Sequence, residues 1–297
     1  MTATIFSPAK INLHLAVTGR RADGFHNLVS VAAPLDFGDT LVAEAGVAQA
    51  PVGGQFTLAC DNPAVPVDER NLILKAARAF RAASGWPGAV HFRLQKRIPM
   101  GAGLGGGSSN AVAALRALQE FSGGALSEAR LTDVAAAVGA DCVLFLKSGP
   151  VVMRGRGEQV TALPEGSARR LRGRRVLLFK PSFSIRTAWA YEKMAANGRH
   201  YRSAPAAEAM FAAWLDGSAP AEELLGNNME GVVFEKYVAL PVMLELLRSR
   251  FGVAGRMSGS GSACFALLPD QEDATPIAAC IHEGWGPAAF VREARML

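Results

Sequence analysis

The sequence predicts a protein that mixes helices and strands, either α/β or α+β, and that divides into two domains. Its 297 residues exceed the size of a typical single core, about 100–200 residues. Segments with the two-residue period of strands alternate with segments of helical period along the whole chain. Half of the residues are apolar and 19% are charged, as in folded globular proteins. These observations argue against an all-α fold and against long disorder.

The N-terminal half contains two clear strands with a helix between them. Apolar and polar residues alternate over 10–18 and again over 90–95, which predicts two half-buried strands. Residues 71–83 carry apolar side chains at helical spacing and stop before Gly85, so we expect a helix there. Further helices are predicted at 110–121 and 127–138, and buried strands at 142–146 and 151–152.

The C-terminal half continues the alternation after an arginine-rich stretch. Residues 169–175 include five arginines and no aromatic residue, so we interpret them as a solvated loop near a domain boundary. The predicted domains are therefore 1–160 and 161–297. Strands are expected at 176–179, 263–268 and 289–292, and helices at 206–215, 241–250 and 274–282.

The cysteine spacing, the net charge and the lengths of the apolar runs limit the kinds of protein that this sequence can encode. The widely spaced Cys60, Cys142, Cys264 and Cys280 form no CxxC pair, so they predict buried apolar positions rather than disulfides or a zinc site. A net charge of +5 suits an anionic small substrate and argues only weakly for nucleic acid. No apolar run approaches the roughly 18–20 residues of a membrane span, and no secretory leader is visible. We therefore expect a cytoplasmic protein.

A glycine-rich segment between a predicted strand and a predicted helix is the strongest chemical signal. Five of the seven residues 101–107 are glycine, and two serines follow. Glycine at this density allows a ligand to approach the backbone closely. The free N–H groups and the dipole of a helix N-terminus attract phosphate. Residues 99–111, PMGAGLGGGSSNA, therefore predict a phosphate-binding loop.

This loop departs from two common nucleotide motifs. Its glycines satisfy GxGxxG, but the next acidic residue, Glu120, lies inside the following helix and not at the end of a second strand. Ser108 stands where the P-loop motif has lysine. An NAD-dependent oxidoreductase is therefore a less favoured alternative. An RNA-binding protein is disfavoured by the modest charge.

Three separated segments together resemble the signature motifs of the GHMP kinases, which phosphorylate small-molecule alcohols with ATP. They are residues 7–12 (SPAKIN), 99–111 and 258–262 (SGSGS). Within this family, residues 6–40 are most similar to the member that phosphorylates the C2 hydroxyl of a cytidyl-methylerythritol compound in non-mevalonate isoprenoid synthesis. The run Asp23-Gly-Phe-His26 carries that similarity. Another GHMP kinase, of the mevalonate or homoserine type, is the alternative.

The resemblance implies a fold and a set of ligands. The fold is α+β, with an N-terminal ATP-binding domain like domain 2 of ribosomal protein S5 and a C-terminal, substrate-side domain that is ferredoxin-like. ATP is the implied co-substrate, with Mg²⁺, and the acceptor is a small molecule. Neither nucleic acid nor membrane is expected as a partner, and the chain is expected to be a monomer or a weak homodimer.

The resemblance also implies roles for individual residues. Asp141 would be the general base for the acceptor hydroxyl, and Lys10 would orient this pair and stabilise charge on the γ-phosphoryl group. Substrate binding is implied for Asn12, Phe25, His26, Thr187 and Tyr191, with Phe25 and Tyr191 stacking on either side of the cytosine. The ATP phosphates would be held by Pro99, Met100, Gly101, Ala102, Gly103, Leu104, Gly105, Gly106, Gly107, Ser108 and Ser109, and Ser109 would also lie near Mg²⁺.

The chain departs from the family pattern at two places. Phe25 stands where tyrosine is usual, which keeps an aromatic face and loses a hydroxyl; the alternative for Phe25 is a core position near a turn. After Asp141 the family commonly has Val-Pro-Phe, whereas this chain has Cys142-Val143-Leu144. The second departure concerns the backbone path beside the expected base.

Overall fold

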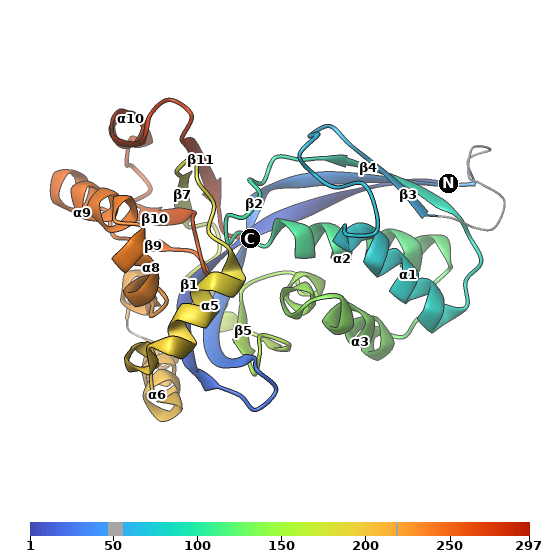
Figure 1. The fold of residues 1–297 in the computed structure, drawn as a ribbon, viewed down its shortest axis with the longest axis horizontal. Coiled ribbons are helices and arrows are strands. Elements are labelled where there is room, and N and C mark those ends of the chain that lie inside the picture. Colours follow the sequence, from blue (N-terminus) through green and yellow to red (C-terminus); the bar gives the residue numbers. More distant parts are fainter. Residues whose placement is uncertain (47–55, 218) are drawn as a thin grey trace. The chain divides into compact units, whose positions relative to one another are not determined.

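The computed structural model describes residues 1–46, 56–217 and 219–297, and it confirms a mixture of helices and strands (Figure 1). The chain forms two compact units, each assembled from several segments. The first comprises Met1–Ala9, Phe37–Ile98 and Gly105–Leu146, and the second Lys10–Asp36, Pro99–Leu104 and Lys147–Leu297. Two long strands, β1 (Thr2–Arg20) and β2 (His26–Ala45), contribute residues to both units. The predicted boundary after residue 160 stays a prediction.

The first unit packs helices on part of a seven-stranded sheet. Strand β4 (Val90–Gln95) pairs antiparallel with the end of β2 and parallel with β3 (Phe56–Cys60). Helices α1 (Leu72–Ser84), α2 (Gly106–Phe121) and α3 (Glu128–Val138) lie side by side (Figure 1). Their apolar faces are buried, as the helical period predicted.

Local capping explains where α1 begins and ends. The Asn71 side chain accepts a hydrogen bond from the Ile73 N–H, which satisfies a backbone donor of the first turn. Gly85 ends the helix in the left-handed region, at φ 69°. The predictions of α1 and β4 are thus confirmed to within a residue or two.

Two predictions for the first unit are wrong. Residues 142–146 form part of a 3₁₀ helix, η1 (Ala140–Leu146), and not a strand. A short buried apolar run carries no period that separates the two conformations, so tertiary packing decides. Helix α2 begins at Gly106, four residues before its predicted start, because glycine signals a loop locally although the helical hydrogen bonds continue through these positions.

The second unit contains an antiparallel four-stranded sheet in the order β11-β7-β10-β9. Helices α9 and α10 pack on each other and on strands at its edges. In the same unit, β8 pairs in parallel with β1, residues 30–32 of β2 pair antiparallel with β5, and β5 pairs antiparallel with β6. The strands of this part of the chain are β5 (Val151–Arg154), β6 (Gln159–Ala162), β7 (Arg175–Lys180), β8 (Gly226–Asn227), β9 (Gly255–Met257), β10 (Cys264–Leu268) and β11 (Phe290–Arg295). The helices are α4 (Glu165–Arg169), α5 (Thr187–Ala196), η2 (Gly198–His200), α6 (Ala204–Leu215), α7 (Ala221–Leu224), α8 (Glu230–Lys236), α9 (Ala239–Phe251) and α10 (Ala274–Trp285).

The arginine-rich stretch is not simply a solvated loop, and this prediction is wrong in part. Residues 165–169 form α4, and Arg175 lies in β7 with 8% of its surface exposed. Its guanidinium pairs with Glu293 at 2.7 Å and donates to three backbone carbonyls. Arg170 stacks over the Trp214 ring at 4.0 Å. These arginines join elements together, which composition alone did not indicate.

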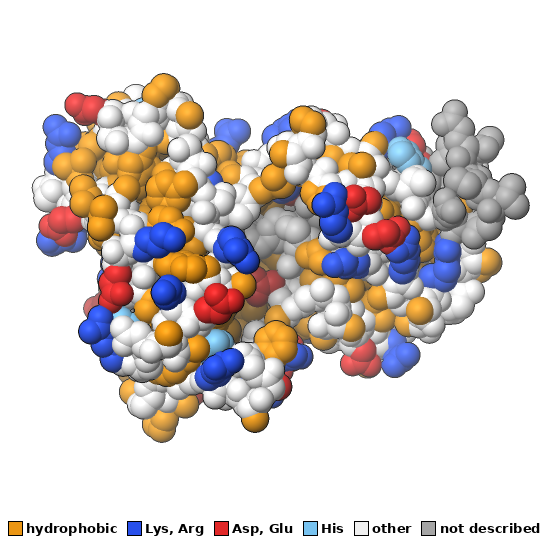
Figure 2. All heavy atoms as spheres, viewed as in Figure 1, with side chains coloured by type: hydrophobic (Ala, Val, Ile, Leu, Met, Phe, Trp, Pro, Cys, Tyr) orange, Lys and Arg blue, Asp and Glu red, His pale blue; other side chains and the backbone are white. Residues whose placement is uncertain are grey.

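The remaining compositional predictions concern cysteines and membrane spans. The prediction of buried cysteines is confirmed for Cys142, Cys264 and Cys280, which are free thiols, and it is wrong for Cys60, which is half-buried. Within the described ranges, no helix has the length and apolarity that crossing a bilayer requires. On the face shown in Figure 2, Lys and Arg side chains lie among acidic and apolar ones, not in a single basic patch.

Candidate active site

The second half of the glycine-rich loop is the start of helix α2, in the first unit. Gly105 precedes the helix at φ 72°, in the left-handed region where glycine is unstrained. The Ser109 N–H donates to the Gly105 carbonyl at 2.9 Å, so the helix is formed from its first turn. The N–H groups of that turn have no acceptor within the helix and carry the positive end of its dipole. An anion therefore finds both donors and a favourable field here.

A buried polar network holds this helix start in place. Asp39 has no exposed surface, and its carboxylate accepts from the Asn110 side chain at 2.8 Å and from Lys96 Nζ at 2.6 Å. Asn110 also donates to Ser7 Oγ, and Ser7 Oγ donates to Ser109 Oγ, each at 2.8 Å. Burial lowers the pKa of Lys96, against the opposing effect of the Asp39 charge. Sequence reasoning missed Asp39 and Lys96, because neither belongs to a recognisable motif, and it gave no role to Asn110 within the 99–111 segment.

Asp141 lies in η1 and is half-buried. The next side chain, the Cys142 thiol, is hydrogen-bonded to Ser108, in the first turn of α2. Burial raises the pKa of Cys142 to about 12, so it remains a thiol. Cys142, which departs from the family pattern, therefore links the segment next to Asp141 in sequence to the glycine-rich loop.

The first half of the loop, Pro99–Leu104, belongs to the second unit. Its backbone carbonyls accept from four surrounding groups: the Lys10 N–H, Ser184 Oγ, Ser258 Oγ and the Ala263 N–H. Gly103 has φ 77°, and a Cβ atom there would lie 2.2 Å from the Ser258 carbonyl oxygen. This close approach explains why only glycine fits at position 103.

The Lys10 side chain is 4% exposed and lies on the same face of β1 as Asn12. Its Nζ donates to Asn12 Oδ1 at 2.6 Å, and Asn12 Nδ2 donates to Ser30 Oγ at 2.9 Å. Ser30 Oγ in turn donates to the His14 carbonyl at 2.6 Å. The chain of donors fixes the direction of the ammonium group.

The residues expected to bind the cytidyl group also lie in the second unit. The His26 ring centroid is 4.9 Å from that of Tyr191, and its Nε2 is 3.0 Å from the Tyr201 hydroxyl. Burial lowers the pKa of His26, which favours the neutral imidazole. Thr187 Oγ1 is 2.8 Å from Ser260 Oγ, so α5 begins beside the 258–262 loop. Tyr201 was missed by sequence reasoning.

Phe25 is not a core residue, since 55% of its surface is exposed. The Arg156 guanidinium lies 4.9 Å from its ring centroid. This excludes the alternative of a core position near a turn. The ring is available as a stacking surface.

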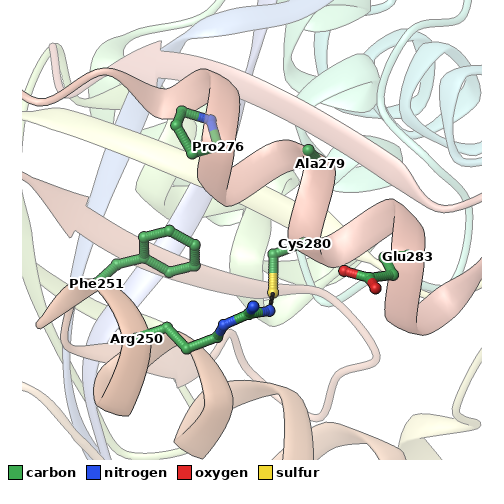
Figure 3. Close-up of a pocket in the computed structure, with 6 residues that line it drawn as sticks. All are labelled: Arg250, Phe251, Pro276, Ala279, Cys280 and Glu283. Carbon is green, nitrogen blue, oxygen red and sulfur yellow. Dashed lines mark hydrogen bonds between the residues drawn. The ribbon is translucent and has the colours of Figure 1, made fainter.

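The predicted site residues fall into two sets. Asp141 and Gly105–Ser109 belong to the first unit, and Lys10, Asn12, Phe25, His26, Pro99–Leu104, Thr187 and Tyr191 belong to the second. A separate hollow between α9 and α10 contains none of them (Figure 3). It is lined by Arg250, Phe251, Pro276, Ala279, Cys280 and Glu283, with Arg250 Nη1 3.6 Å from Cys280 Sγ.

The side chains of the described residues could bind Mg²⁺ only together with the phosphates of a bound nucleotide. Within the described part of the chain, no three His, Cys, Asp or Glu side chains converge as a metal site. Ser109 Oγ is 1% exposed and accepts from Ser7. Mg²⁺ is commonly bound by one or two carboxylates together with substrate phosphates and water. The donor set therefore suits an ion that arrives with a nucleotide, not a resident one.

Comparison with known proteins identifies relatives over nearly the whole chain. The model of the GHMP kinases N terminal domain matches residues 71–151, and that of the GHMP kinases C terminal domain matches residues 206–290. A 4-diphosphocytidyl-2-C-methyl-D-erythritol kinase from Synechococcus sp. (strain CC9311) is 37% identical, over 98% of this chain and 95% of the relative. The two-domain α+β fold class is thereby confirmed.

Solved structures agree with these matches. The crystal structure of a 4-(cytidine 5'-diphospho)-2C-methyl-D-erythritol kinase superposes with a TM-score of 0.75 at 32% identity, covering 99% of both chains. A homoserine kinase from Cytophaga hutchinsonii reaches a TM-score of 0.74 at 19% identity, over 99% of this chain and 95% of that one. At that identity the second likeness shows the fold alone.

Proposed function

The chain belongs to the 4-diphosphocytidyl-2-C-methyl-D-erythritol kinases of the GHMP family, and we propose that it transfers the γ-phosphoryl group of ATP to the C2 hydroxyl of that cytidyl alcohol. The products are the 2-phosphate and ADP. The observation that carries this proposal is similarity to that kinase over nearly the whole chain, and the glycine-rich start of helix α2 at Gly105–Ser109 supports it. The cytoplasmic location and the monomeric or weakly dimeric state stay predictions.

Phosphoryl transfer asks little covalent chemistry of the protein. It needs reactants held in line, a group that accepts the hydroxyl proton, and positive charge near the transferred group. We assign the proton to the Asp141 carboxylate and the positive charge to Lys10, whose ammonium Asn12 holds in place. The first turn of α2 supplies backbone donors for the ATP phosphates.

Recognition of the acceptor alcohol depends on its cytosine ring. Cytosine is flat and stacks on aromatic faces. We assign the stacking faces to Phe25 and Tyr191, and hydrogen bonding to the cytidine diphosphate part to Asn12 and His26. When bound with ATP, Mg²⁺ would offset negative charge on the phosphates, and Ser109 would be a candidate to hold it through its side-chain oxygen.

An ADP-release assay tests the proposed function. The purified chain is given ATP, Mg²⁺ and, in turn, 4-diphosphocytidyl-2-C-methyl-D-erythritol, mevalonate and homoserine. We expect release of ADP with the cytidyl alcohol and a kcat/KM at least about 100-fold lower with the other two, because they lack the base. A preference for mevalonate or homoserine would refute the assigned substrate.

Replacing the proposed base tests the mechanism. Asp141→Asn should lower kcat by about 10²–10⁴-fold, the usual contribution of general acid–base catalysis, with little change in ATP affinity. The matched control is Asp133→Asn, which removes an exposed carboxylate from the neighbouring helix α3. We expect the control to keep kcat within twofold. Near-normal turnover by folded Asp141→Asn would remove Asp141 from the mechanism.

A further inference from the structure

Asn227 is a buried amide that no motif in the sequence singled out. It lies in the two-residue strand β8, opposite Leu15 of β1, and only 7% of its surface is exposed. All of its side-chain hydrogen-bonding groups are engaged by backbone. Nδ2 donates to the carbonyls of Met257 and Gly259, both at 2.8 Å, and Oδ1 accepts from the Met229 N–H at 3.0 Å.

The two carbonyls that Asn227 binds flank Ser258, where the serine- and glycine-rich turn 258–262 begins. Glu230 binds the residue before the turn, since its Oε1 accepts from the Met257 N–H at 2.8 Å. Asn227 and Glu230 therefore bind both the entry strand and the first residues of the turn. Because the partners are backbone groups, the contacts fix the path of the chain at this point.

The turn also contacts the phosphate-binding loop and the strand that carries Lys10. Ser258 Oγ donates to the Gly103 carbonyl at 3.1 Å and accepts from the Asn12 N–H at 3.3 Å. A Cβ atom at Gly259 would lie 3.5 Å from Lys10 Nζ and 3.4 Å from Asn12 Oδ1. A displacement of Ser258–Gly259 would therefore move or crowd the ammonium of Lys10 and the backbone of Gly103.

We infer that Asn227 is a positioning residue for phosphoryl transfer, acting by holding the Ser258–Gly259 turn against Lys10 and Gly103. It touches neither expected substrate. Its effect on the reaction comes through the placement of the lysine and of the first half of the phosphate-binding loop. A misplacement of 1 Å, even by a change remote from the reacting atoms, can cost on the order of 100-fold in rate. This inference rests on the proposed phosphoryl transfer and on the role of Lys10 in it, but not on the identity of the acceptor alcohol.

The neighbouring Asn228 is a matched control, since its side chain also makes three hydrogen bonds to backbone. Oδ1 accepts from the Val17 N–H, and Nδ2 donates to the carbonyls of Val17 and His200, all at 2.8 Å. None of these partners belongs to the 258–262 turn. Asn228→Ala therefore removes a comparable set of contacts without releasing the turn.

The experiment compares kcat at saturating ATP and cytidyl alcohol, well below the melting temperature of each variant. We expect Asn227→Ala to lower kcat at least tenfold and Asn228→Ala to keep it within about threefold, although both lower the melting temperature. Equal kcat values in the two variants would overturn the inference, because loss of stability alone would then account for both. If Asn227→Ala does not fold, the comparison uses Asn227→Asp in its place, because aspartate keeps an oxygen that can accept from the Met229 N–H.

A double-mutant cycle tests the route of the effect. Ser258→Ala removes the hydroxyl that bonds Gly103, and we expect it to lower kcat as well. If both residues act through one turn, the double variant loses less than the product of the two single losses. Strictly multiplicative losses would overturn the inference. Should the wild-type chain prefer another alcohol, the proposed function fails, and the same comparison with that alcohol still decides the role of Asn227.

Discussion

At position 25 the side chain combines high exposure with an aromatic face, which a stability role does not explain. Stacking of a base on an aromatic ring is worth about 1–3 kcal/mol. Phe25→Ala should therefore raise the KM for the cytidyl alcohol by roughly 5- to 150-fold. The KM for ATP should not change, and the melting temperature should stay within about 2 °C, because more than half of the residue's surface is exposed. Steady-state kinetics for each substrate, with a thermal melt, check this.

The control at the same position is Phe25→Tyr, which restores the residue usual in the family. It changes one hydroxyl, so its effect is limited to about 0.5–1.5 kcal/mol, or roughly tenfold in affinity. Equal losses for ATP and the cytidyl alcohol in Phe25→Ala would contradict a stacking role, and so would a marked fall in melting temperature.

Among the elements, those with local signals could be predicted and those set by tertiary contacts could not. Residues 72–84 carry a helical period, and the cap Asn71 and the terminating Gly85 lie directly beside them in sequence. Strand β2 was missed because Pro34 and Gly38 interrupt its alternation. The site shows the same division. The glycine-rich loop is contiguous in sequence, whereas Asp39 reaches Asn110 across 71 residues.

The two glycines at the start of helix α2, Gly106 and Gly107, allow a test of whether phosphate approaches this part of the backbone. A Cβ atom at Gly107 would meet only Leu72 Cδ1, at 3.4 Å, which is ordinary contact. Alanine stabilises a helix interior by roughly 0.5–1 kcal/mol relative to glycine. Gly107→Ala should therefore keep or raise the melting temperature while weakening ATP binding severalfold in calorimetry, because a bound phosphate needs the space. Gly106 is unsuitable for this test, since a Cβ atom there would lie 3.0 Å from Lys96 Nζ.

The matched control is Gly166→Ala, in the first turn of α4. A Cβ atom at Gly166 meets nothing within 4 Å, and α4 contains no predicted site residue. We expect its ATP affinity to equal that of the wild type. Unchanged ATP affinity in Gly107→Ala as well would show that the start of α2 does not bind phosphate closely.

For the whole molecule, two buried groups give the stability opposite dependences on pH. Burial lowers the pKa of His14 from 6.5 to about 4, so its contribution to stability is complete above pH 6.5 and is lost as the pH falls toward 4. Burial raises the pKa of Glu230 from 4.5 to about 7, against the opposing effects of the Met257 N–H and of Arg256. Its contribution is complete below pH 4.5 and is lost as the pH rises toward 7. Between these limits the two effects offset each other.

Replacing either side chain should reveal the pH dependence of stability that the other one causes. Since a tenfold change in a proton-binding constant is worth about 1.4 kcal/mol, each group contributes on the order of 3 kcal/mol across its range. Relative to the wild type, Glu230→Gln should gain stability as the pH rises from 4.5 to 7, because glutamine can still accept from Met257 without becoming charged. In His14→Asn the new amide can still donate to the Leu224 carbonyl. The difference in stability between this variant and the wild type should not vary with pH above 6.5, and the variant should gain relative stability as the pH falls toward 4. Urea unfolding at half-unit steps from pH 4 to 8 measures both difference curves, in which the groups common to all three proteins cancel. Flat difference curves would show that neither side chain binds protons differently in the folded and unfolded states.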